Sequence, residues 1–271
     1  MGDRQGLSSV LSLNSVPRKI SSVESAKERA NGAANFNTTH WTIVLACGDE
    51  SDSARAQQAL ASLFQTYWYP LYAYVRRRGY SEHDAEDLVQ AFCLHLQEKH
   101  AVSKADPHRG KFRTFLLSSL QNFLSHENER ARAQKRGGGR ELIRLDAQEA
   151  DARYQLEPSH SVTPEAIFEK RWAHALLEQT VSGLRADFTL RGKERLFDGL
   201  SSFLTSDLRD TSYQSAADQL GLPLSAVKTT VHRLRLDYRS KLREEIGRTV
   251  SSPDEIEDEL LHLRQVLASA A

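Results

Sequence analysis

The chain has few of the residues that stabilise a protein outside the reducing interior of a cell. Only Cys47 and Cys93 are cysteines, and they lie far apart in the sequence. A disulfide framework or a structural zinc site needs more closely spaced cysteine or histidine ligands, so neither is expected. No apolar run approaches the length of a membrane span, and the first residues lack the basic-then-apolar order of a signal peptide. The sequence therefore predicts a cytoplasmic protein without membrane insertion.

Motifs that carry out catalysis are also absent. None of the chain's 10 histidines forms the i,i+4 pair beside a glutamate that helical zinc sites use. The glycine run at residues 137–139 follows a helical segment, whereas a phosphate-binding loop precedes one. The sequence therefore predicts no enzyme, no metal and no cofactor.

Net charge is absent too, but the charges are unevenly distributed. The formal net charge is +0 at pH 7. Basic residues far outnumber acidic ones between residues 109 and 140, whereas residues 254–259 are almost entirely acidic. A DNA backbone responds to local fields rather than to net charge, so neutrality does not exclude a nucleic-acid partner.

The hydrophobic periodicity is helical almost throughout, and strand-like alternation is absent. The predicted fold class is all-α, with two helical domains joined by a flexible linker. We expect helices at about 53–79, 81–99, 111–135, 163–184, 192–206, 213–221, 224–248 and 253–267, with Pro70 breaking or kinking the first. The predicted parts are a disordered arm (1–38), a first domain (39–136), a linker (137–163), a second domain (164–248) and a helical tail (249–271).

Residues 213–236 predict a helix-turn-helix in the second domain. Ala217 is small where two helices cross closely, Gly221 can adopt a left-handed turn, and Val227 seals the second helix onto the first. The second helix continues as one apolar stripe, which comprises Val227, Val231, Leu234, Tyr238 and Leu242. Polar and basic residues off this stripe suit the DNA major groove, although a solvated face of an ordinary core helix would also show them.

Two helices of the first domain carry further candidate surfaces. Within residues 84–97 one face is apolar (Ala85, Leu88, Val89, Phe92 and Leu96), and the opposite face carries Asp87, Gln90, Leu94 and Gln97. Such a face suits docking onto another helix more than mere solvation. In residues 111–136, Phe115, Ser118, Asn122 and Ser125 run beside a core stripe and precede several arginines. Stacking, amide and basic groups together suit single-stranded DNA, although Phe115 could equally be a core residue.

The order of these segments resembles bacterial RNA polymerase sigma factors of the compact extracytoplasmic-function (ECF) type. Residues 67–80 running into 84–92 (DAEDLVQAF) resemble the family's core-binding segment. Residues 112–136 resemble its promoter-melting helix, and residues 213–242 resemble its domain for the upstream promoter element. The resemblance covers about residues 39–245. The arm and the tail depart from the family minimum, which leaves open whether an anti-sigma factor is a partner.

The resemblance implies a role for each candidate site residue. Contacts with core RNA polymerase fall to Asp84, Glu86, Asp87, Gln90, Leu94 and Gln97. The residues expected to act in promoter melting and to contact single-stranded DNA are Phe115, Ser118, Asn122, Arg130, Arg132, Lys135 and Arg136. The residues expected to bind duplex promoter DNA are Ser225, Lys228, Thr229, His232, Arg233 and Arg239. The alternative is a helix-turn-helix regulator that binds DNA without engaging polymerase, for which the Asp87 and Gln90 face would have no use.

The tail gives one further expectation. Its acidic start precedes an apolar stripe formed by Ile256, Leu260, Leu263 and Val266. We expect the tail to fold onto a helical domain and to shield the basic recognition helix, which is the nearest segment of opposite charge in the sequence.

Overall fold

The computed structural model describes residues 53–98, 111–133, 153–154, 162–205, 212–250 and 252–269. Every regular element in these ranges is a helix and none is a strand, so the predicted all-α class is confirmed. The predicted arm and most of the predicted linker lie outside the described residues. Within the described ranges, no helix is both long and apolar enough to span a membrane.

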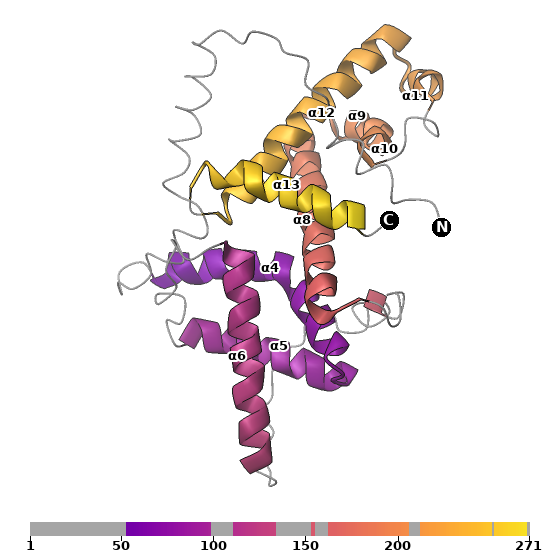
Figure 1. The fold of residues 1–271 in the computed structure, drawn as a ribbon. Coiled ribbons are helices and arrows are strands. Elements are labelled where there is room, and N and C mark those ends of the chain that lie inside the picture. The colour runs from indigo at the N-terminus through magenta and orange to yellow at the C-terminus, as the bar shows by residue number, and fades with distance from the viewer. Residues whose placement is uncertain are drawn as a thin grey trace. The chain divides into compact units, whose positions relative to one another are not determined.

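The helix boundaries follow the predicted ones closely, with one division and one extension. The segment expected at 192–206 forms two short helices, and the helix expected to end at 184 continues to Leu190. The helices are α4 Ser53–Arg77, α5 Glu82–Glu98, α6 Phe112–Ala133, α8 Pro164–Leu190, α9 Glu194–Leu200, α10 Ser202–Thr205, α11 Tyr213–Leu220, α12 Leu224–Gly247 and α13 Glu255–Ser269 (Figure 1).

Pro70 does not break its helix. It lies inside α4, which runs without interruption to Arg77. Pro70 and the residues that follow it, Leu71 to Val75, are buried, and Trp68 stacks on Tyr72 with ring centroids 5.4 Å apart. Tertiary packing of this aromatic turn therefore outweighs the hydrogen bond that proline removes.

The described residues divide into two compact units. The N-unit contains the described residues up to Ala175 together with Arg248–Pro253, and the C-unit contains Leu176–Gly247 and the residues from Asp254 onward. The division falls inside α8, later than residue 164, where the second domain is predicted to begin. The first half of α8 and the segment Arg248–Pro253, which we call the connector, thus pack with the N-terminal helices.

The core of the N-unit forms where α5 packs on α4 and on α6 (Figure 1). Tyr67 meets Phe112 edge to face with ring centroids 5.1 Å apart, and Phe92 meets Phe123 at 5.6 Å. The first half of α8 adds Ile167, Phe168 and Trp172, all buried. Burial of large aromatic side chains is the dominant stabilising contribution of such a small helical core.

The connector completes this unit at the start of α6. The backbone N–H of Phe112, the first residue of α6, donates to the carbonyl oxygen of Thr249 at 3.2 Å. The first N–H groups of a helix have no partner within the helix, so the connector satisfies one of them. Val250 is fully buried beside this contact in the chain. A segment from near the C-terminus is therefore part of the N-unit core.

The core of the C-unit is the apolar stripe of α12. All five predicted residues, Val227 to Leu242, are buried. Helices α10, α11 and α13 contact α12, and the Arg235 guanidinium donates to the Phe203 carbonyl oxygen at 3.0 Å (Figure 1). The buried residues of α13 are Glu259, Leu263 and Leu267. Of the predicted tail stripe, Leu263 is thus buried, and Ile256, Leu260 and Val266 are half-buried.

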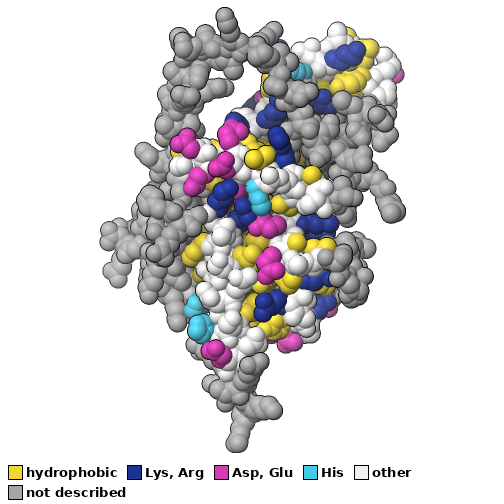
Figure 2. Space-filling model, viewed as in Figure 1, with side chains coloured by type: hydrophobic (Ala, Val, Ile, Leu, Met, Phe, Trp, Pro, Cys, Tyr) yellow, Lys and Arg dark blue, Asp and Glu magenta, His cyan; other side chains and the backbone are white. Residues whose placement is uncertain are grey.

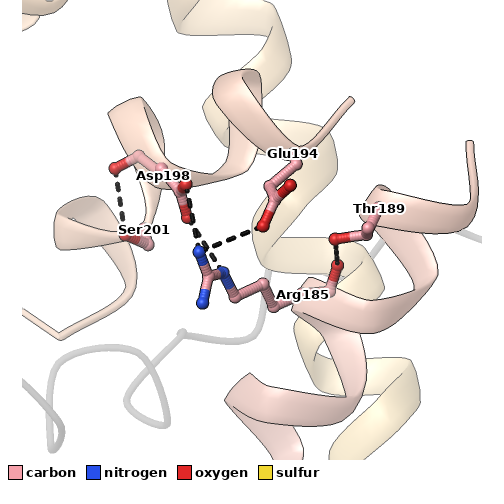
Figure 3. Close-up of polar contacts among 5 residues, drawn as sticks. All are labelled: Arg185, Thr189, Glu194, Asp198 and Ser201. Atoms are coloured by element: carbon pink, nitrogen blue, oxygen red, sulfur yellow. Dashed lines mark hydrogen bonds and ion pairs between the residues drawn. The ribbon is translucent and has the colours of Figure 1, made fainter. Parts of the chain in front are cut away.

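Helix α8 is joined to α9 by a tight turn and an ion-pair cluster. Gly192 has a φ of 67° and ends α8 in a turn in which the Lys193 N–H donates to the Phe188 carbonyl at 2.8 Å. Beyond the turn, Arg185 of α8 contacts Asp198 at 3.1 Å and Glu194 at 3.1 Å (Figure 3). Asp198 and Glu194 raise the pKa of the Arg185 guanidinium, which stays charged. Because these groups are half exposed, the cluster orients α9 more than it stabilises the unit.

Candidate functional surfaces

Helix α5 presents a polar face that is smaller than the sequence predicts. Its apolar face is buried as expected except for Leu88, which is half-buried, and Asp87 and Leu94 are exposed. Gln90, however, is only 9% exposed, and its amide donates to Glu86 Oε1 at 3.4 Å. Gln90 is therefore nearly buried although it lies on the predicted docking face, and its contact with polymerase stays a prediction. The Gln97 side chain lies outside the described set.

The acidic residues at the start of α5 have structural partners of their own. The Ser81 hydroxyl donates to Asp84 Oδ2 at 2.6 Å and accepts from the Asp84 N–H at 3.2 Å, which caps the helix. His83 lies 3.8 Å from the Asp87 carboxylate, and both are exposed. Of the six predicted polymerase contacts, Asp87 and Leu94 are thus the exposed ones without a capping role.

Helix α6 presents a polar, uncharged face. Ser118, Asn122 and Ser125 are exposed on it, as the sequence predicts. Phe115 is half-buried, with its ring centroid 6.4 Å from that of Phe112, so only part of this ring is available for stacking. The side chains of Arg130 and Arg132 lie outside the described set, as do residues Lys135 and Arg136.

Arg113 is a site residue that the sequence reasoning missed. It belongs to the basic run around α6, but its side chain is buried and pairs with Glu169 of α8. Its guanidinium lies 5.0 Å from the ring centroid of Trp172. Its position on α6, directly beside the core stripe, indicates that it is buried. A buried basic residue needs an acidic partner, so the sequence could have indicated this ion pair.

The turn between α11 and α12 has the geometry that its residues predict. Ser212 caps α11 by accepting from the Ser215 N–H, and Gly221 ends it with a φ of 65° in the left-handed region. Ala217 is 3% exposed and Val227 is fully buried. Helix α12 begins at Leu224, and the two helices are in contact. The short turn therefore fixes the angle between α11 and the N-terminal end of α12.

The N-terminal half of α12 is polar and uncovered. Ser225, Lys228, Thr229, His232 and Arg233 are exposed, whereas Arg239 is half-buried. The Thr229 hydroxyl donates to the Ser225 carbonyl at 3.0 Å, which leaves its methyl group and its acceptor lone pairs outward. This half has exposed basic and polar groups and no acidic residue before Asp237. Its field favours a polyanion.

The tail does not shield this half. Helix α13 contacts α12, and Glu257 pairs with Arg243 in the C-terminal half of α12. Figure 2 shows acidic side chains gathered on the surface where α13 begins. The tail thus folds onto the recognition helix as predicted, but the predicted shielding does not reach its exposed N-terminal half, because the opposite charge that the tail meets lies farther along α12. The tail acts as a structural brace of the C-unit.

Two titratable groups in the described residues have pKa values raised by burial. Burial raises the pKa of the Cys93 thiol to about 12, so this thiol is protonated at neutral pH and is a poor nucleophile. Burial also raises the pKa of Tyr238. No group of three or more His, Cys, Asp and Glu side chains within the described ranges could hold a metal ion.

A comparison with protein families identifies one segment of the chain. Residues 63–134, which span most of α4 and all of α5 and α6, match the family described as Sigma-70 region 2. Neither the curated proteins nor the solved structures yield a match. The matched segment supports a sigma factor, a class of transcription protein that is in general not enzymatic.

Proposed function

We propose that the protein is a sigma factor of the ECF type that binds core RNA polymerase and directs promoter recognition, DNA melting and transcription initiation. The observation that carries this proposal is the match of residues 63–134 to Sigma-70 region 2. Within that segment, the exposed acidic group of Asp87 and the exposed apolar Leu94 lie on one helix face, as a protein-docking surface requires. Such a protein acts in the cytoplasm, where polymerase and promoter DNA are found.

The two DNA-binding roles fall to different units. The exposed Ser118, Asn122 and Ser125 of α6 would contact unpaired promoter bases, with the arginines of its C-terminal half holding phosphates. Helices α11 and α12 would form a helix-turn-helix whose exposed Lys228, His232 and Arg233 enter the major groove of the upstream element. Each surface thus has polar groups that can hydrogen-bond to base edges, which are exposed in unpaired DNA for α6 and in the major groove for α12.

The test of this proposal uses the full-length protein. It should bind purified core polymerase and allow run-off transcription from a subset of genomic fragments on which core alone is silent. A protein that binds duplex DNA but not core polymerase would instead be the helix-turn-helix regulator, the alternative that the exposed face of α12 supports. A protein that binds neither would remove both functions.

Replacement of Arg233 tests the duplex-reading role of α12. If the guanidinium makes a bidentate base contact, Arg233→Ala should weaken promoter binding by ~1–3 kcal/mol and relax specificity at one position. If it contacts phosphate alone, affinity should fall uniformly across sequences and the salt dependence should decrease. Fluorescence anisotropy against a panel of duplexes distinguishes the two. Arg191→Ala, which removes an exposed arginine at the end of α8, is the control, and equal losses in both variants would take α12 out of the groove.

Replacement of Asn122 tests base capture by α6. Asn122→Ala should leave core binding and duplex affinity near wild type and should slow open-complex formation about tenfold, because one amide contact to a base edge is worth ~1–3 kcal/mol. A template with a pre-melted bubble should hide much of the defect, since unpairing has already occurred. His126→Ala, an exposed change one turn farther on α6, serves as the control. Normal transcription of an intact duplex by Asn122→Ala would assign this face a structural role only.

A further inference from the structure

The first half of α8 supports α6 from a position beyond the linker in sequence. Residues 164–175 pack in the N-unit, where Ile167, Phe168 and Trp172 are buried. The order of contacts shows the direction of packing. Arg113, near the start of α6, meets Glu169, whereas Gln121, two turns later, meets Glu165. The two helices therefore run antiparallel.

The polar contacts between α6 and the first half of α8, which we call the seam, are a largely buried ion pair and a shared carboxylate. The side chains of Arg113 and Glu169 are 10% and 22% exposed, and the Arg113 guanidinium also lies over the Trp172 ring. Farther along, Gln121 Nε2 donates to the Tyr74 hydroxyl at 3.1 Å and to Glu165 Oε1 at 3.3 Å. The Tyr74 hydroxyl donates to the same carboxylate at 3.3 Å. Directional contacts thus occur at both ends of the seam.

A buried ion pair is a poor source of stability, because the cost of removing two charges from water offsets their attraction. Apolar residues of similar volume often stabilise such a site as well or better, and in some proteins buried ionic groups serve instead to fix one arrangement of the helices. The seam at Arg113 and Gln121 lies next to the exposed face with Ser118, Asn122 and Ser125. Any rotation of α6 about its axis would redirect that face.

We propose that Arg113 and Glu169 are positioning residues that fix the rotational setting of α6 and so present the Asn122 face to unpaired DNA. The inference rests on the proposed role of α6 in promoter melting. Trp172 restricts the Arg113 guanidinium to one plane, and Glu169 anchors it from a helix that is itself held by Glu165. Promoter opening therefore depends also on Glu169 and Trp172, which lie after the predicted linker and outside the segment matched to Sigma-70 region 2.

The decisive variant replaces the pair without emptying the site. In full-length protein, Arg113→Met combined with Glu169→Leu should retain the wild-type melting temperature and core affinity. Its open complexes, measured by permanganate reactivity of unpaired thymines on promoters selected by wild-type run-off transcription, should form at least tenfold more slowly. The charge-swapped pair, Arg113→Glu with Glu169→Arg, should recover only part of that loss, because a carboxylate at position 113 cannot replace the guanidinium over the Trp172 ring. An apolar pair that opens promoters at the wild-type rate overturns the proposal.

Two controls keep the result interpretable. Removing the exposed ion pair of the C-unit, with Arg185→Gln and Asp198→Asn, should leave promoter opening unchanged (Figure 3). If the apolar pair fails to fold, Arg113→Lys takes its place, because an ammonium keeps the charge but loses the planar stacking on Trp172. That variant should fold and open promoters several-fold more slowly, and an unchanged rate overturns the proposal. Wild-type protein that does not bind core polymerase would instead contradict the proposed function itself.

Discussion

Asp87→Arg should abolish stable binding of the protein to core RNA polymerase while leaving its helical content unchanged. Asp87 is exposed on α5, where its carboxylate lies 3.8 Å from the exposed His83, so replacing it does not disturb the core. Placing a positive charge in an interface that is complementary to a negative one costs several kcal/mol. A loss of about 3 kcal/mol or more lowers affinity more than about a hundredfold.

The measurement is a binding titration of core polymerase, with circular dichroism as the check on folding. Asp254→Arg is the matched control, since it makes the same change of charge at an exposed residue outside α5. Gln90 is unsuitable for this test because it is nearly buried, so its replacement would mix folding with binding. Equal affinities of Asp87→Arg and wild type would remove α5 from the polymerase interface.

Val250→Asp should destabilise the N-unit by about 3 kcal/mol or more, because it places an unpaired charge at a fully buried position. Val250→Ala, which removes two methyl groups, should cost about 2 kcal/mol. Both effects should appear in urea unfolding followed by the fluorescence of Trp68 and Trp172, two of the tryptophans of the N-unit.

Leu261→Asp is the control for this prediction. Leu261 lies in α13, is 48% exposed, and undergoes the same kind of apolar-to-acidic change a short distance along the chain. It should alter stability by less than about 1 kcal/mol. If Val250→Asp unfolds no earlier than Leu261→Asp, the connector contributes nothing to the core of the N-unit.

The sequence predicts the helices and their buried faces well because both depend on local information. The α12 stripe from Val227 to Leu242 and the turn at Gly221 follow from periodicity and backbone preference, and the structure confirms them. Pro70, which does not break α4, is the opposite case. Its tolerance in α4 comes from buried aromatic neighbours, which no local pattern contains.

The candidate surfaces were predictable as helix faces but not as sets of free side chains. Helical spacing places Gln90 beside Asp87, yet Gln90 is nearly buried and Asp87 is exposed. The partners of Arg113 and of Glu257 likewise belong to other helices, so sequence charge alone assigned them to a general basic or acidic stretch. The docking and DNA-binding roles of these faces remain predictions.

The hydrogen bond between Phe112 and Thr249 has a consequence for how the chain folds as it is made. A ribosome that has just released α6 must add on the order of a hundred further residues before Thr249 exists, which takes about ten seconds or more. Throughout that interval the start of α6 has no connector, and neither Trp172 nor Val250 covers its flank until each has been synthesised. Contacts between residues so distant in sequence also form slowly. The N-terminal helices are thus translated first, but the core of the N-unit cannot be completed until residue 250 has been made.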